Sequence, residues 1–170
     1  FSSNGPENSN RIGECMSNYQ SAKREIQNYI RARTPLVIID SPERERVERM
    51  LEEIAREWGI RVDYYTDAKQ VSSFNGEGRR DVGHDPLPYL TAAFQKNRNL
   101  TFALGDVRRI GDDNAYSREV LNILYLAREH NHTLLLITAD PVWHRLAQFG
   151  MLTVLDYPDM EERTAQIETF

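Results

Sequence analysis

Five short blocks of apolar residues alternate with longer amphipathic segments along the chain. The first block, at residues 36–40, is a continuous run of Leu, Val and Ile, which is the pattern of a strand buried on both faces of a sheet. The blocks predict strands over residues 36–40, 61–65, 100–104, 133–138 and 152–156. The second block is the most amphipathic of the five, so we expect it near an edge of the sheet.

The segments between the blocks have helical periodicity. Apolar residues spaced three and four apart from Val47 to Trp58 predict a helix that Gly59 ends, with Ser41 as its N-cap and Pro42 at its first position. Further helices are predicted over 17–32 and 117–129, and short ones after the Asp-Pro pairs at 85–86 and 140–141. The polar stretch 66–84 is predicted to be a long loop.

Strands that alternate with helices predict βαβ crossovers and a mostly parallel sheet with helices on both faces. The predicted fold class is therefore α/β, a three-layer sandwich around a five-stranded, mostly parallel sheet.

Composition narrows the class of protein without naming a function. The chain has 170 residues, enough for one domain, and its net charge of -5 gives no general reason to bind nucleic acid. Its single cysteine, Cys15, excludes an internal disulfide. No apolar run approaches the ~20 residues of a membrane-spanning helix. We therefore expect a cytoplasmic domain with no membrane partner.

Ligands of such sheets bind beyond the carboxyl ends of the strands, so residues at those positions are the first candidates for a site. Acidic residues end or follow four of the predicted strands, and the candidates are three of these acids, the arginines near Asp106 and in the 66–84 stretch, and the histidine after Asp140. We predict that these residues form a partner-contact edge: Asp40, Arg79, Arg80, Asp106, Arg108, Arg109, Asp140 and His144.

The residues at these positions predict neither a nucleotide-binding site nor a catalytic nucleophile. A P-loop needs glycines and a lysine after the first strand, where this chain has Asp40, Ser41, Pro42 and Glu43. Ser41 is explained as a helix cap, and the chain has no Gly-x-Ser-x-Gly elbow. No catalytic, cofactor-binding or metal-ligating residue is predicted.

One alternative function stays open at this point. A stand-alone receiver-like domain, performing metal-dependent phosphotransfer, would use Asp40 and Asp106 together with Thr138 after the fourth strand. Its lysine after the fifth strand is replaced here by Asp156 and Tyr157. In a receiver the first and third strands are neighbours, so the strand order distinguishes this alternative.

Several motifs together resemble one group of AAA ATPases. The group is the chloroplast and cyanobacterial type with its bacterial relatives, in which a degenerate RecA-like domain precedes the AAA module. The resemblance spans roughly residues 23–167 and rests on Arg-Thr-Pro-Leu at 33–36, Glu-Arg-Val at 45–47, Asp-Pro-Leu at 85–87, the strands at 100–106 and 133–138, and the exit sequence at 152–163. The chain departs from the pattern in its long 66–84 stretch and in Gly-Asp-Val-Arg at 105–108.

The resemblance implies a RecA-like sheet without an ATP site of its own. It implies a tail at 1–14, the α/β domain at 15–160, and at 160–170 the start of a helix leading to an AAA module outside this sequence. The expected function is a non-catalytic interaction and assembly domain. ATP and Mg²⁺ would bind in the AAA module, which is an expected partner, and the full-length protein would be an oligomer, often a hexamer.

Overall fold

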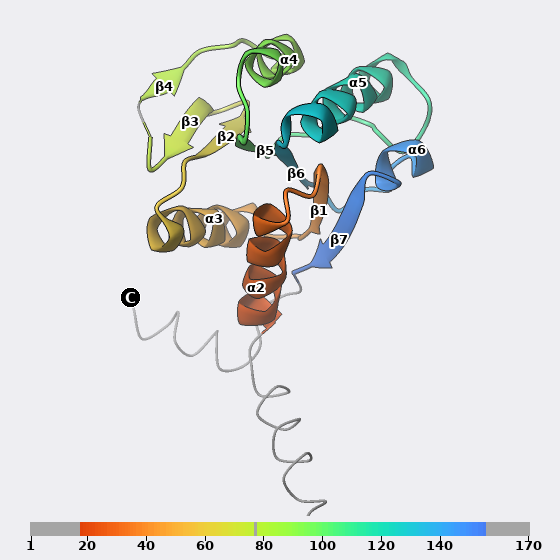
Figure 1. Cartoon of the computed structure of the whole chain (residues 1–170). Helices are drawn as coiled ribbons and strands as arrows, with labels where there is room; N and C mark the ends of the chain where they lie inside the picture. Colours follow the sequence, from red (N-terminus) through yellow and green to blue (C-terminus); the bar gives the residue numbers. More distant parts are fainter. Residues whose placement is uncertain (1–17, 77, 156–170) are drawn as a thin grey trace, which may run out of the picture.

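A single mixed sheet of seven strands runs through the computed structural model, which describes residues 18–76 and 78–155 (Figure 1). The strand order is β4-β3-β2-β5-β6-β1-β7. Five strands are parallel to one another, and they are the five that the sequence predicts: β1 (Leu36–Asp40), β2 (Val62–Thr66), β5 (Thr101–Leu104), β6 (Thr133–Ile137) and β7 (Gly150–Val154).

The prediction of a five-stranded sheet is wrong by two strands, because the stretch 66–84 is not simply a loop. It contains β3 (Gln70–Phe74), antiparallel to β2, and the two-residue β4 (Arg79–Arg80), antiparallel to β3. Serines and arginines make this hairpin too polar for hydrophobic patterning to detect. The hairpin also covers β2, whose five residues are all buried, so β2 lies inside the sheet instead of at its edge.

Helices cover both faces of the sheet and complete three layers (Figure 1). One face packs against α2 (Asn18–Arg31) and α3 (Arg44–Trp58), and the other against α4 (Leu87–Lys96), α5 (Ala115–His130) and α6 (His144–Ala147). Alternate residues of β1 enter the two cores: Val37 and Ile39 join the α2–α3 core, while Leu36 and Ile38 join the other. Because β1 is buried on both faces, nearly every residue of this strand has to be apolar.

The starts of α3 and α6 differ from the predictions, whereas α3 ends at the predicted residue. Gly59 ends α3 with φ 63°, a left-handed conformation that glycine adopts without strain. Its N-cap, however, is Glu43 and not Ser41, because the Ser41 hydroxyl bonds within the preceding turn. Likewise α6 begins at His144, several residues after the Asp-Pro pair that was expected to cap it.

The predicted tail at 1–14, the end of the domain after residue 155 and the helix at 160–170 lie outside the described residues. Among the helices of the described part, none is both long and apolar enough to cross a membrane.

Candidate functional site

A small cleft lies where β1, β5 and β6 end, in the region where the sequence predicts partner contacts. It has a volume of about 270 Å³. Residues from the turn after β1, the turn after β5 and the end of β6 line it: Ser41, Pro42, Arg44, Gly105, Asp106, Val107, Ile137, Thr138, Ala139 and Asp140.

The turn between β1 and α3 forms one wall of this cleft and is closed by its own hydrogen bonds. The Ser41 hydroxyl, in a residue only 8% exposed, accepts from the Glu43 N–H at 3.1 Å and lies 3.2 Å from the Glu43 carbonyl oxygen. Pro42 has no N–H to offer a ligand. Asp40 and Glu43 place carboxylates at the two ends of the turn. The wall therefore presents negative charge and few free donors.

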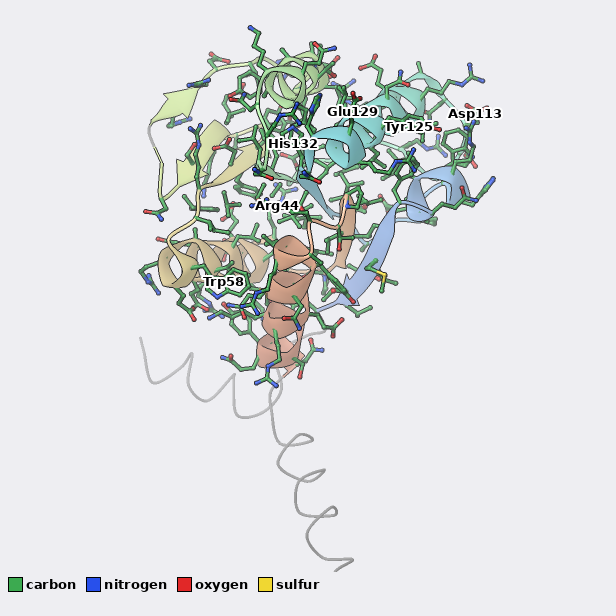
Figure 2. All side chains as sticks on the ribbon, viewed as in Figure 1. Arg44, Trp58, Asp113, Tyr125, Glu129 and His132 are labelled. Atoms are coloured by element: carbon green, nitrogen blue, oxygen red, sulfur yellow. The ribbon has the colours of Figure 1, made fainter. Side chains whose placement is uncertain are left out.

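Asp106 is held on both carboxylate oxygens. Arg44, at the start of α3, donates to Oδ1 at 2.5 Å, and the Asp67 N–H donates to Oδ2 at 2.6 Å (Figure 2 labels Arg44). These contacts join the ends of β5 and β2 to α3 across the cleft. Asp106 thus lines the cleft with both of its carboxylate oxygens already hydrogen-bonded within the domain.

Sequence reasoning missed Arg44, although a signal was available. Arg44 is a cation in the first turn of the helix that follows the first strand. It therefore lies at the same edge of the sheet as Asp106. A helix N-terminus favours acidic residues, and an arginine there indicates a nearby carboxylate.

At the end of β5, the backbone at Gly105 packs closely against the side chains of Tyr64 and Thr66 on β2. A Cβ on Gly105 would lie 2.6 Å from the Tyr64 hydroxyl oxygen and 2.8 Å from Cγ2 of Thr66, so only glycine fits. Burial raises the pKa of both Tyr64 and Tyr65, and a hydrogen bond to Asp67 raises the pKa of Tyr65 further. Both phenols therefore stay protonated at neutral pH and supply no base to the cleft.

Asp140 connects the cleft to two other hollows. It lines the cleft, a pocket of about 350 Å³ that also contains Arg109, and an apolar groove of about 380 Å³ that also contains Asp40. Within residues 18–76 and 78–155, neither aspartate has an ion-pair partner. These two carboxylates are available to a partner, unlike that of Asp106.

The predicted arginines and histidine are not gathered at one place. Arg108 donates to the His84 carbonyl oxygen at 2.9 Å, and His144 is exposed at the start of α6. Arg79 and Arg80 form β4 at the lateral edge of the sheet, where Arg80 donates to the Tyr89 hydroxyl at 3.1 Å. The eight candidates therefore divide into a group around the strand ends and a pair on β4.

His132, which Figure 2 labels, lies in the turn between α5 and β6 and is nevertheless completely buried. Its Nδ1 accepts from the Leu100 N–H at 2.9 Å, its Nε2 donates to the Phe94 carbonyl oxygen at 2.9 Å, and its ring stacks on Phe94. Burial lowers the pKa of His132, and this effect outweighs the hydrogen bond to the Phe94 carbonyl, which raises it. His132 is a neutral structural residue that joins α4 to β5 and β6.

Two observations bear on the phosphotransfer alternative. First, β6 lies between β1 and β5, so the strands that carry Asp40 and Asp106 are not neighbours as they are in a receiver. Second, no three His, Cys, Asp or Glu side chains of the described residues come together as a metal-binding group. The residue pair that this alternative needs is therefore not assembled.

The fold and these turns define an α/β domain with a mostly parallel sheet and a strand-end cleft in which Ser41 and Asp106 are hydrogen-bonded within the domain. The family model of the SpoVK-like AAA ATPase N-terminal domain matches residues 22–145. The chain therefore belongs to the family of SpoVK-like AAA ATPase N-terminal domains. Neither the curated proteins nor the solved structures contain a significant match to it.

Proposed function

We propose that this chain is a non-catalytic interaction and assembly domain, and that ATP and Mg²⁺ bind to a separate AAA module of the same protein. Family membership supports the association with an AAA ATPase. The strand order supports a RecA-like sheet, in which the fourth parallel strand separates the first from the third.

The observation that carries the proposal is the turn between β1 and α3. In RecA-like nucleotide sites this turn wraps the phosphates with glycine N–H groups and a lysine. Here Pro42 lacks an N–H, the Ser41 hydroxyl is bonded to Glu43, and the carboxylates of Asp40 and Glu43 would repel a triphosphate. The residues present do not fit ATP.

A domain that does not bind nucleotide serves an AAA machine through contacts. We infer that the unpaired acids and the apolar groove at the strand ends contact substrate proteins or neighbouring parts of the assembly. The exit segment after β7 would link these contacts to nucleotide-driven motion in the AAA module, and the full-length protein would be a cytoplasmic oligomer, with a hexamer as the expected state.

Calorimetric titration of the 170-residue chain with ATP and Mg²⁺ tests the non-catalytic assignment. We expect no saturable heat and no change in the melting temperature of the same sample, whose cooperative unfolding shows that it is folded. Stoichiometric ATP binding, or a melting temperature that rises with ATP concentration, would overturn the proposal.

A further inference from the structure

The outer strand β7 exposes apolar side chains that the rest of the domain leaves uncovered. Met151, Leu152 and Val154 are 48%, 55% and 43% exposed. Among the described residues, only Tyr125 is a comparably exposed large hydrophobic side chain, and it lies on α5. Exposed apolar residues concentrated on one edge strand indicate an interaction surface.

The apolar groove continues from β7 under α6. Leu152 is in register with Ile38 of β1, so both side chains point to the same face of the sheet. That face is covered by α5 over the central strands, but α6 has only four residues and leaves the β1–β7 end open. The groove there is lined by Ile38, Asp40, Thr138, Ala139, Asp140, Pro141, Val142, Ala147 and Leu152.

The backbone of β7 can accept another strand. Leu155 donates its N–H to the Asp40 carbonyl oxygen at 2.8 Å. The backbone N–H and C=O groups of the odd-numbered residues of β7 therefore point toward β1. The backbone groups of Leu152 therefore point to the outer side of the sheet, as does the Val154 carbonyl, which accepts from Asn18. An extended segment would hydrogen-bond to this edge and place alternate side chains in the groove.

Charge indicates which segment would bind. Asp40 and Asp140 stand at the groove, and Glu25 lies on the other side of β7, where the Thr153 hydroxyl donates to it at 3.4 Å. In the part of the chain that the structure describes, none of these three carboxylates has an ion-pair partner. A second copy would bring the same acids together, whereas basic side chains would complement them.

We propose that the β7 edge binds an extended segment of a partner protein in which apolar side chains are flanked by Lys or Arg. An apolar side chain of the segment packs against the exposed side chain of Leu152, at the β7 side of the groove. Its basic neighbours pair with Asp40, Asp140 and Glu25. This inference rests on the proposed function as an interaction domain and names the chemistry of the partner.

The test uses a fluorescein-labelled peptide, Lys-Lys-Leu-Thr-Val-Leu-Lys-Lys, and a matched peptide with Glu in place of every Lys. Fluorescence anisotropy is measured against the 170-residue chain at low and physiological salt. We expect the Lys peptide to bind at least about tenfold more tightly than the Glu peptide, with affinity that falls as salt rises. Equal affinity for the two peptides would overturn the proposal.

Variants locate the binding site. Leu152→Ser and the double variant D40N/D140N should each weaken the Lys peptide by about tenfold, because one removes the apolar contact and the other two charges. Tyr125→Ser is the matched apolar control, and E45Q/E52Q removes two charges from the exposed face of α3. Both controls should bind as the unaltered chain does. Equal losses in the controls and the β7 variants would contradict the proposed location.

Sedimentation of the chain alone tests whether a second copy of the chain, and not a partner segment, covers β7. A concentration-dependent dimer that Leu152→Ser abolishes would show that a second copy covers β7, and would overturn the proposal. The ATP titration is independent of both results. Failure of the peptide to bind would leave the non-catalytic assignment standing, whereas ATP binding would remove that assignment whatever the peptide does.

Discussion

The two edges of the sheet are built differently. At one edge, β4 has two residues, both arginines and both exposed, and a short charged strand of this kind discourages pairing with other chains. At the other edge, β7 has five residues and exposes Met151, Leu152 and Val154. The β4 edge is therefore short and charged, whereas the β7 edge is longer and exposes apolar side chains.

The attachment of the two edges differs as well. The β7 backbone packs so closely on β1 that a Cβ on Gly150 would overlap the Leu36 carbonyl group. The β4 edge is connected through β3 and through a contact of Arg80 with α4. One edge therefore depends on close backbone packing, and the other on the backbone pairing of a hairpin, with one exposed side-chain contact to α4.

The largest expected loss of stability comes from a substitution at the β7 edge. Gly150→Ala should lower the free energy of unfolding by about 3 kcal/mol or more, because the overlapping group is backbone and cannot move aside. Gly59→Ala is the matched control: nothing lies within 4 Å of a Cβ there, and its left-handed conformation should cost only about 1 kcal/mol. Urea denaturation measures both. Equal losses would mean that close fit does not hold β7.

An intermediate effect on stability is expected in the middle of the sheet, away from both edges, where His132 joins α4 to β5. His132→Asn should lower the free energy of unfolding at neutral pH by about 2 kcal/mol, since it leaves the Leu100 N–H or the Phe94 carbonyl without a partner. Urea denaturation at pH 7 measures this loss. A loss below about 0.5 kcal/mol, the level of an ordinary surface change, would contradict the role assigned to His132.

The same residue predicts a pH dependence. Because burial lowers the pKa of His132 in the folded state, the unfolded chain takes up this proton first as pH falls below about 6.5. Its contribution to the free energy of unfolding is complete above that pH and declines below it, until the folded state also becomes protonated. The stability of the unaltered chain should therefore fall more steeply than that of His132→Asn between about pH 7 and pH 5. Parallel slopes would contradict this assignment.

The smallest effect on stability is expected at β4 itself. The double variant R79V/R80V should change the free energy of unfolding by no more than about 0.5 kcal/mol, because both side chains are exposed. It should nevertheless increase light scattering on concentration, because the protecting charges are gone. Met151→Lys should have the opposite effect at β7. Unchanged scattering in R79V/R80V would show that the arginines do not protect this edge.

The sequence predicted the parallel part of the fold because apolar blocks and helical periodicity record burial directly. All five parallel strands and the left-handed end of α3 at Gly59 follow from such patterns. The β3–β4 hairpin did not, because Ser72, Ser73 and Arg79 pair through backbone groups that carry no hydrophobic signal.

Candidate residues were predicted less completely than the fold. Acids at strand ends are visible in the sequence, so Asp40, Asp106 and Asp140 were found. Their division into a paired residue, Asp106, and two unpaired ones depends on Arg44 and on the Asp67 N–H, which meet it from other elements. The burial of His132 likewise depends on contacts more than thirty positions away in the chain.

The most direct test of the difference between the two edges is amide hydrogen exchange with and without the Lys peptide. We predict that binding slows exchange at the outward-facing amides of Leu152 and Val154 and leaves Arg79 and Arg80 unchanged. Protection at β4, or at the Ser41–Asp106 cleft with none at β7, would contradict the account.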